Sequence, residues 1–163
     1  MIDLRIGSGL DVHAFATGRR LVIAGVEIPH PRGLEGHSDG DPAIHALIDA
    51  LLGAASLPDI GQRFPSSEPR YAGANSLDLL AEVARDLEQR QWRLVNADIT
   101  IIAQEPRLST YVPRMKQVLT ERLQVDLDQI GIKATTTDHL GALGRAEGVG
   151  ALAVALLQRG EPG

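Results

Sequence analysis

The chain has 163 residues and a formal net charge of −5, and 44% of its residues are hydrophobic. A chain of this length buries about 70% of its unfolded surface, so we expect a single domain over residues 1–163. The chain has no cysteine, which excludes disulfides and thiolate metal sites, and its acidic balance disfavours a nucleic-acid surface. No apolar run approaches the roughly 20 residues that span a bilayer, and no secretory-signal pattern opens the chain, so we expect no membrane partner and a cytoplasmic location.

Five segments are predicted to form strands or hairpins. Residues 4–13 begin as a strand, which Gly7 and Gly9 are expected to loosen. Residues 21–28 predict a tight hairpin about Gly25, or a strand that is bulged there. Further strands are predicted over 97–103, 129–136 and 149–157. The last is apolar throughout, so we expect burial on both faces, although its periodicity also fits a helix.

Three helices are predicted between these strands. The first begins at Pro42, with Asp41 as its N-cap. The second runs from about Ser76 to Gln89, and the third follows Pro113. The first carries its apolar residues at helical spacing on one face: Ile44, Leu47, Ile48, Leu51 and Ala55. Strands grouped at both ends predict an α+β domain, with a mixed four-stranded sheet, helices packed on one face and a small N-terminal β-hairpin.

An acidic stretch that contains histidine is the first candidate for chemistry. Between Gly33 and Gln62 there are five acidic residues and no Lys or Arg. A solvated face is the usual explanation of such a stretch. However, His45 and Asp49 are four residues apart, so they project from one side of the predicted helix, at the border of its buried face. A histidine at such a border either coordinates a metal or donates to a backbone carbonyl, and its position alone favours the second.

Asp11 and His13 are two residues apart in an extended segment, so their side chains point the same way. Together with His45 they make a set of two histidines and one carboxylate that leaves a fourth position open, as in catalytic zinc sites. An isolated Asp-x-His pattern is weak evidence for a metal site, and it gains weight here only from the further histidine, His45.

Two other segments offer groups that bind phosphate. Residues 37–41, His-Ser-Asp-Gly-Asp, enter the first helix, where free N–H groups and the helix dipole favour an anion, but the same residues also serve as caps. Residues 133–138, Lys-Ala-Thr-Thr-Thr-Asp, offer hydroxyls and, in Asp138, a carboxylate suited to Mg²⁺. Threonines are also ordinary strand residues. His30 and His139 are assigned to the surface or to turns.

Taken together, these segments resemble one family, the 2-C-methyl-D-erythritol 2,4-cyclodiphosphate synthases of non-mevalonate isoprenoid biosynthesis. The resemblance runs from residue 5 to about residue 157. Its most specific part is the His-Ser-Asp-Gly-Asp segment that leads into the helical His45. It is also carried by residues 5–13, 49–54, 59–61, 64–65, 101–104, 133–137 and 144–148.

The resemblance implies a homotrimer with active sites between neighbouring subunits. It implies an intramolecular phosphoryl transfer that converts 4-diphosphocytidyl-2-C-methyl-D-erythritol 2-phosphate to the cyclic diphosphate and CMP. By motif position, Asp11, His13 and His45 would bind one Zn²⁺ per active site. His37 and Thr136 would stabilise the transition state.

Asp138 would bind a second ion, Mg²⁺ or Mn²⁺, which bridges the phosphates of the substrate. Asp49 and Asp59 would hold the methylerythritol hydroxyls, and residues 103–109 with Thr135 and Thr136 would line the cytidine and α-phosphate site. The substrate-binding set implied in this way is Ser38, Asp49, Asp59, Ile60, Gly61, Phe64, Pro65, Ser66, Ser67, Glu68, Ala103, Gln104, Glu105, Pro106, Arg107, Leu108, Ser109, Thr135, Thr137, Ala142 and Arg145.

Three positions depart from the family pattern. Asp138 stands where Glu is usual, Ala142 replaces a common aromatic residue, and Arg107 replaces a frequent Lys, which keeps the charge but changes its geometry. Two alternative functions stay open. One is a hydrolase of a related nucleotide diphosphate, and the other is a non-catalytic trimeric module that binds a nucleotide or an isoprenoid phosphate.

Overall fold

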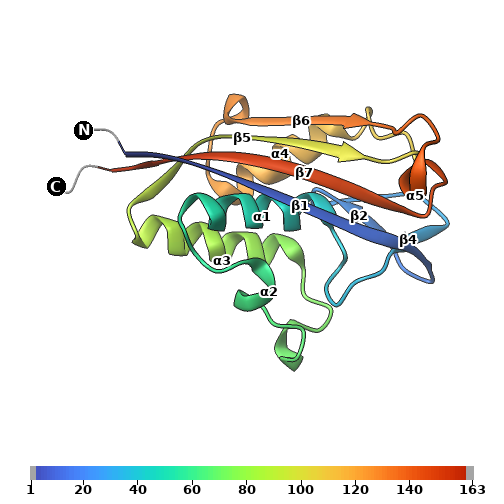
Figure 1. Cartoon of the computed structure of the whole chain (residues 1–163), viewed down its shortest axis with the longest axis horizontal. Helices are drawn as coiled ribbons and strands as arrows, with labels where there is room; N and C mark the ends of the chain where they lie inside the picture. Colours follow the sequence, from blue (N-terminus) through green and yellow to red (C-terminus); the bar gives the residue numbers. More distant parts are fainter. Residues whose placement is uncertain (1–2, 161–163) are drawn as a thin grey trace.

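The structure, a computed structural model, describes residues 3–160. Four long strands lie side by side along the molecule: β1 (Asp3–Thr17), β7 (Gly148–Arg159), β5 (Trp92–Ile102) and β6 (Ile130–Thr135) (Figure 1). β5 and β6 are parallel, whereas β7 is antiparallel to both β1 and β5. The predicted α+β fold with a mixed sheet is therefore confirmed.

Within residues 3–160, the sheet contains five strands, not the predicted four. Its order is β4-β1-β7-β5-β6, and the additional strand, β4 (Arg32–Leu34), pairs with the end of β1. A strand of only three residues shows too little alternation of apolar and polar side chains to be recognised in the sequence. The predicted hairpin is confirmed as β2 (Leu21–Ile23) and β3 (Val26–Ile28), and the two turn residues between them have positive φ, as a tight two-residue hairpin loop requires.

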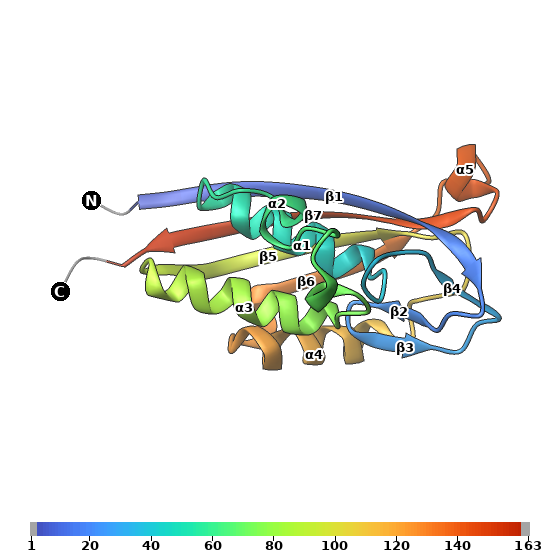
Figure 2. The same cartoon turned by 90° about the horizontal axis from the view of Figure 1, so that it is seen from below.

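The three predicted helices are α1 (Pro42–Ala54), α3 (Ser76–Gln89) and α4 (Val112–Leu123). As predicted, α1 begins at its proline, and the Asp41 side chain accepts from the second and third backbone N–H groups. α3 and α4 lie side by side (Figure 2). The short turns α2 (Ile60–Arg63), η1 (Pro69–Tyr71), η2 (Leu127–Gln129) and α5 (Gly141–Gly144) were not predicted. Within residues 3–160, no helix is both long and apolar enough to cross a membrane.

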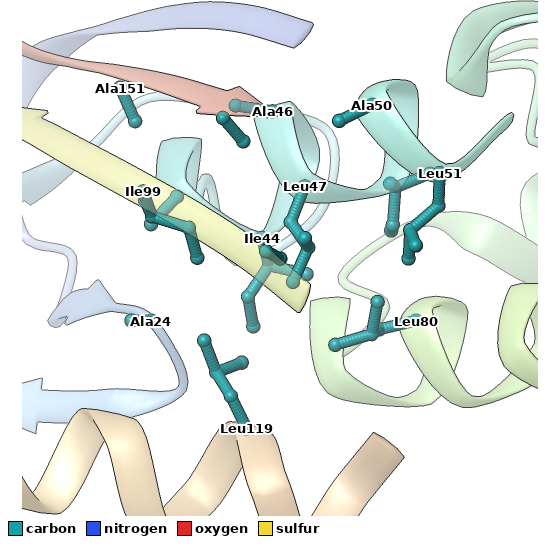
Figure 3. Packing of buried hydrophobic residues seen from close by; sticks show 14 of the residues in the cluster. Ala24, Ile44, Ala46, Leu47, Ala50, Leu51, Leu80, Ile99, Leu119 and Ala151 are labelled. Carbon is teal, nitrogen blue, oxygen red and sulfur yellow. The ribbon is translucent and has the colours of Figure 1, made fainter. Parts of the chain in front are cut away.

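α1 is buried nearly all round rather than along one face, because it lies between the sheet and α3. In Figure 3, Ile44 and Leu47 point from α1 into the space that Leu80 of α3 and Leu119 of α4 enter from the opposite side. The opposite face of α1 carries small side chains at Ala46 and Ala50. These small residues let the helix approach the strands closely.

Gly7 and Gly9 bring α1 onto β1, so the prediction that they loosen the strand is wrong. A Cβ atom on Gly9 would lie 2.0 Å from the carbonyl oxygen of Ala46, and one on Gly7 would lie 2.1 Å from that of Ala50. A carbon atom and a carbonyl oxygen that are not bonded to each other do not approach more closely than van der Waals contact. Only glycine therefore fits at these two positions. The helix that carries His45 therefore lies directly on the strand that carries Asp11 and His13.

The other face of β1 and β7 is apolar and uncovered. Leu10 and Ile6 of β1 are 64% and 73% exposed, and they stand opposite Leu152 and Leu156 of β7. The prediction that the last strand is buried on both faces is wrong for the single chain, because Leu152 is 43% exposed. We call this surface the open face; it comprises Leu4, Ile6, Leu10, Val12 and Leu152. Apolar patches that exceed the usual size often mark interaction surfaces.

Candidate metal and phosphate site

Asp11, His13 and His45 bring three donor atoms to one point. Asp11 Oδ2 lies 2.8 Å from His13 Nε2 and 2.9 Å from His45 Nδ1, and the two ring nitrogens are 3.1 Å apart. Donors around a tetrahedral ion with bonds of about 2.0–2.1 Å stand about 3.3 Å apart, so a small outward shift of the side chains accommodates the ion. These three are a group, within the part of the chain that the structure describes, that could hold a metal.

The hydrogen-bond partners of the two rings fit a metal at this point. His13 Nδ1 lies against the backbone carbonyl of Glu35, which can only accept, so this nitrogen carries the hydrogen. Nε2 of His13 then presents its lone pair to the centre. On His45, the outer nitrogen Nε2 lies 2.9 Å from Ser76 Oγ and 3.1 Å from Ser38 Oγ. Partners on the outer nitrogens are the usual means by which metal-binding histidines are oriented.

The electrostatics of the cluster favour a positive charge at its centre. Burial opposes the ionisation of Asp11, but hydrogen bonds and positive charge from His13 and His45 outweigh it and hold the pKa of Asp11 below its ordinary value. Burial also acts against the charged form of His13, yet the hydrogen bond and the charge of Asp11 outweigh it and raise the pKa of His13. Both shifts favour a positive charge at the point where a metal would bind.

Several predicted residues surround this group. Asp49 lies one turn beyond His45 on α1 and accepts from the backbone N–H of Ile60 at 2.8 Å. Burial is the main cause that raises the pKa of Asp49, and the charges of Asp59 and Asp11 add to it. Asp59 caps α2, and hydrogen bonds from the side chain and backbone of Gln62 lower the pKa of Asp59.

The rest of this segment follows α2. Ile60 and Gly61 belong to α2 itself, and Phe64 is buried with its ring centroid 5.3 Å from that of Tyr71. Ser66 and Ser67 are exposed. His37 is also exposed, whereas the neighbouring Ser38 is buried.

A second group of predicted residues lies where β5 and β6 end. The Gln104 side chain accepts from the backbone N–H of His139 at 3.2 Å, which joins the loop after β5 to the loop after β6. The Thr136 hydroxyl donates to Asp138 Oδ1 at 3.2 Å. Arg145 follows α5 and pairs with Glu147. The structure thus brings together residues 103–109, Thr135–Asp138 and the segment around Ala142 at one end of the sheet (Figure 1).

Within one chain, the two clusters do not meet. The register places His13 opposite Val149 of β7, and Gly150 opposite Ile102 of β5, which in turn pairs with Thr135 of β6. Three strand spacings separate β1 from β6, so Thr135 lies about 14 Å from His13. Thr136 and Asp138 therefore reach the end of the sheet that carries the triad, but they do not join the metal group.

Two contacts of the site were missed in the sequence. Ser76 contacts His45 from a helix that starts 31 residues later, and no local pattern marks it, because serine at a helix start is ordinary. Arg19 donates to the backbone carbonyls of Gly36 and Ser38 at 2.9 and 2.5 Å and so holds the loop that carries His37. Nothing in the spacing of Arg19 distinguishes it from a surface arginine.

The fold and the site define a class: an α+β protein with a site of two histidines and one carboxylate beside loops that offer phosphate ligands. Residues 4–158 match the model of the YgbB family, and the chain belongs to this family. A relative from Syntrophomonas wolfei subsp. wolfei, named 2-C-methyl-D-erythritol 2,4-cyclodiphosphate synthase, is 51% identical over 96% of this chain and 99% of its own length. The family resemblance seen in the sequence is thereby confirmed.

Solved structures agree with this assignment. The bifunctional IspDF from Campylobacter jejuni superimposes with a TM-score of 0.94 and is 39% identical, with 98% of this chain and 43% of that chain covered. A Plasmodium falciparum IspF in complex with CDP superimposes with a TM-score of 0.85 and is 30% identical, with 96% of each chain covered.

Proposed function

We propose that this protein converts 4-diphosphocytidyl-2-C-methyl-D-erythritol 2-phosphate to 2-C-methyl-D-erythritol 2,4-cyclodiphosphate and CMP. The observation that carries the proposal is the convergence of Asp11, His13 and His45 in a chain of this family. An oxygen of the 2-phosphate attacks the β-phosphorus. The bond from the β-phosphorus to the bridging oxygen breaks, and its electron pair leaves with CMP. The attacking phosphate is already ionised at neutral pH, so positioning and charge neutralisation are the main requirements.

In this proposal, Asp11, His13 and His45 hold Zn²⁺. Two imidazoles and one carboxylate with a fourth position open are the donor set of catalytic zinc. When bound, the ion supplies a positive charge that neutralises and polarises the diphosphate. The protein's part is to hold three donors in place, and the packing of α1 on β1 achieves this.

The remaining predicted residues position the substrate. His37 and Thr136 donate hydrogen bonds to the oxygens of the transferred phosphate, and Asp49 and Asp59 accept from the methylerythritol hydroxyls. These roles need side chains that a substrate can reach, and both His37 and Thr136 are exposed. Orienting both ends of one substrate in this way contributes roughly 7–11 kcal/mol to such reactions.

The cluster at the ends of β5 and β6 receives the nucleotide in this proposal. Residues 103–109 with Thr135 bind the cytidine and α-phosphate. Asp138 would hold Mg²⁺ or Mn²⁺, which would supply a further positive charge to the phosphates. The Asp138 carboxylate is exposed beside the Thr136 hydroxyl, so an ion can reach it. A related structure that contains CDP supports a cytidine nucleotide as ligand.

We further propose that the active site forms between subunits of a homotrimer. The metal group lies at β1 and the nucleotide cluster lies at the ends of β5 and β6, and β7 lies between β1 and β5. The two halves of the proposed site are therefore apart within one chain. The open face supplies an apolar surface for association. A neighbouring copy can then bring its nucleotide cluster to the metal group.

Leu10→Glu on the open face is expected to dissociate the trimer, because it places a charge in the proposed apolar interface. Light scattering coupled to gel filtration is expected to give the mass of one chain instead of three. The matched control is Leu127→Glu, because Leu127 is 56% exposed, much like Leu10, but lies in η2 away from the open face. If Leu10→Glu and Leu127→Glu both stay trimeric, the open face is not the interface.

The reaction itself is tested by phosphorus NMR of the products. With purified protein and a divalent metal, we expect equimolar CMP and a cyclic diphosphate, and we expect a chelator to stop both. We expect a ring because the attacking phosphate belongs to the same substrate molecule as the β-phosphorus. Two free monophosphates instead of a ring would identify the protein as a hydrolase, and tight nucleotide binding without turnover would identify a sensor.

A further inference from the structure

A chain of hydrogen bonds leads from His45 to a buried serine and then to a carboxylate. His45 Nε2 lies 2.9 Å from Ser76 Oγ. The Ser76 hydroxyl contacts Asp39 Oδ1, and the Ser76 backbone N–H donates to Asp39 Oδ2 at 2.9 Å. Neither Ser76 nor Asp39 has a role in the reaction described above.

The direction of these hydrogen bonds follows from the number of hydrogens. An ionised carboxylate only accepts, so the single hydroxyl hydrogen of Ser76 is donated to Asp39. The Ser76 oxygen then faces His45 as an acceptor, which favours a ring hydrogen on Nε2 of His45. Nδ1 lies 2.9 Å from Asp11 Oδ2 and 3.1 Å from His13 Nε2, so with hydrogen on Nε2 its lone pair is directed at the position of an ion. When no ion is present, the Asp11 carboxylate competes for a hydrogen on Nδ1.

The serine is held rigidly. Ser76 is fully buried and is the first residue of α3, and both of its polar groups are bound to one carboxylate. Ser38 Oγ also lies near His45 Nε2, at 3.1 Å. Ser38 Oγ accepts from the Gly40 N–H at 3.3 Å, which occupies a lone pair of the oxygen and leaves the hydroxyl hydrogen free to turn. Ser38 can therefore turn its hydrogen toward or away from His45, whereas Ser76 cannot.

We propose that Ser76 and Asp39 are positioning residues of the metal site, which hold the His45 ring in the Nε2–H tautomer with Nδ1 aimed at the ion. The inference rests on the proposed metal-binding function. Groups that orient a ligand histidine through its outer nitrogen typically contribute about 10–100-fold to metal affinity. Ser76→Ala is therefore expected to weaken zinc binding by about that factor.

The first experiment uses the metal-free protein, so that it does not depend on metal binding. In protein labelled with ¹⁵N-histidine and held at alkaline pH, where the imidazoles are neutral, two-bond ¹H–¹⁵N spectra identify the tautomer of each ring. Asp11 favours hydrogen on Nδ1 and Ser76 favours hydrogen on Nε2, so we expect a smaller Nε2–H fraction for His45 in Ser76→Ala than in the wild type. An unchanged Nε2–H form in Ser76→Ala overturns the inference.

The matched control is Asn75→Ala. The Asn75 side chain caps the same helix by accepting from the backbone N–H of Leu77, and it does not contact His45. Loss of this cap destabilises the start of α3 by about 1 kcal/mol and leaves the hydrogen bonds that join His45, Ser76 and Asp39 unchanged. We expect Asn75→Ala to keep the His45 tautomer. Equal loss of the tautomer in both variants would mean that Ser76 acts only by stabilising the helix.

The second experiment measures zinc affinity by competition with a chromophoric chelator. We expect Ser76→Ala and Asp39→Ala to bind about 10–100-fold more weakly than wild type, with Asp39→Asn between them and wild type because its amide oxygen still accepts. Asn75→Ala should bind as wild type does. If wild type binds no zinc although the tautomer depends on Ser76, the proposed metal function fails. If wild type binds zinc and Ser76→Ala binds it equally well, the positioning role fails.

Discussion

A chain in which His13 and His45 are both replaced by alanine is expected to form the cyclic product at least about 10³-fold more slowly than wild type. The two substitutions remove two of the three donor atoms that converge at the site. A single carboxylate does not hold a zinc ion, and the charge that the ion places on the diphosphate contributes several kcal/mol to such reactions, at 1.36 kcal/mol for each tenfold in rate. Steady-state release of CMP measures this loss.

Zinc content per chain, measured by atomic emission after dialysis, provides the second readout. We expect about one ion per chain for wild type and none for the double variant. His139→Ala is the matched control, because the His139 side chain is exposed and lies outside the triad. It is expected to keep its zinc. A double variant that keeps the wild-type rate would mean that the triad is not the catalytic centre.

The three residues of this triad could be predicted from the sequence, but the sequence could not show that their side chains lie in contact. Strand alternation places Asp11 beside His13, and helical spacing places His45 at the border of the buried face. The contact between them depends on how closely α1 approaches β1, which no periodicity encodes. Ser76 is a stronger example, because its role depends on the hydrogen bonds of Asp39 and His45, both more than 30 residues away.

The helices could be predicted more accurately than the sheet. Helix starts depend on local chemistry, so the Pro42 start and the Asp41 cap were predicted correctly. The length of a strand depends on its partners instead. β1 continues to Thr17, well past the predicted end at residue 13, because β7 and the short β4 both pair with it.

The glycines of β1 produce the largest expected effect on stability. Gly9→Ala is expected to destabilise the fold by about 3 kcal/mol or more, because overpacking of a close contact typically costs about 1–3 kcal/mol and here the obstacle is backbone. The new Cβ would lie 2.0 Å from the carbonyl oxygen of Ala46 and 2.9 Å from the amide nitrogen of Ala50. No side-chain rotation relieves this clash, so α1 must move away from β1.

Thermal unfolding of the metal-free protein measures this cost. For a chain of this size, about 3 kcal/mol corresponds to a fall in Tm of roughly 6–12 °C. The matched control is Gly53→Ala, because Gly53 lies in α1 itself and the nearest atom to its added Cβ is Ser8 O at 4.0 Å. Alanine is the better helix former there, so we expect Gly53→Ala to stabilise the fold by up to about 1 kcal/mol.

The same substitution connects the packing to the metal site. His45 is on the helix that must move, and its partners Asp11 and His13 are on the strand that it must leave. Because Gly9 lies two residues before Asp11 on β1, Gly9→Ala is expected to weaken zinc binding as well as folding, although it removes no donor atom. Gly53→Ala should keep both. A Gly9→Ala chain with wild-type stability and zinc affinity would mean that the close approach of helix and strand does not build the site.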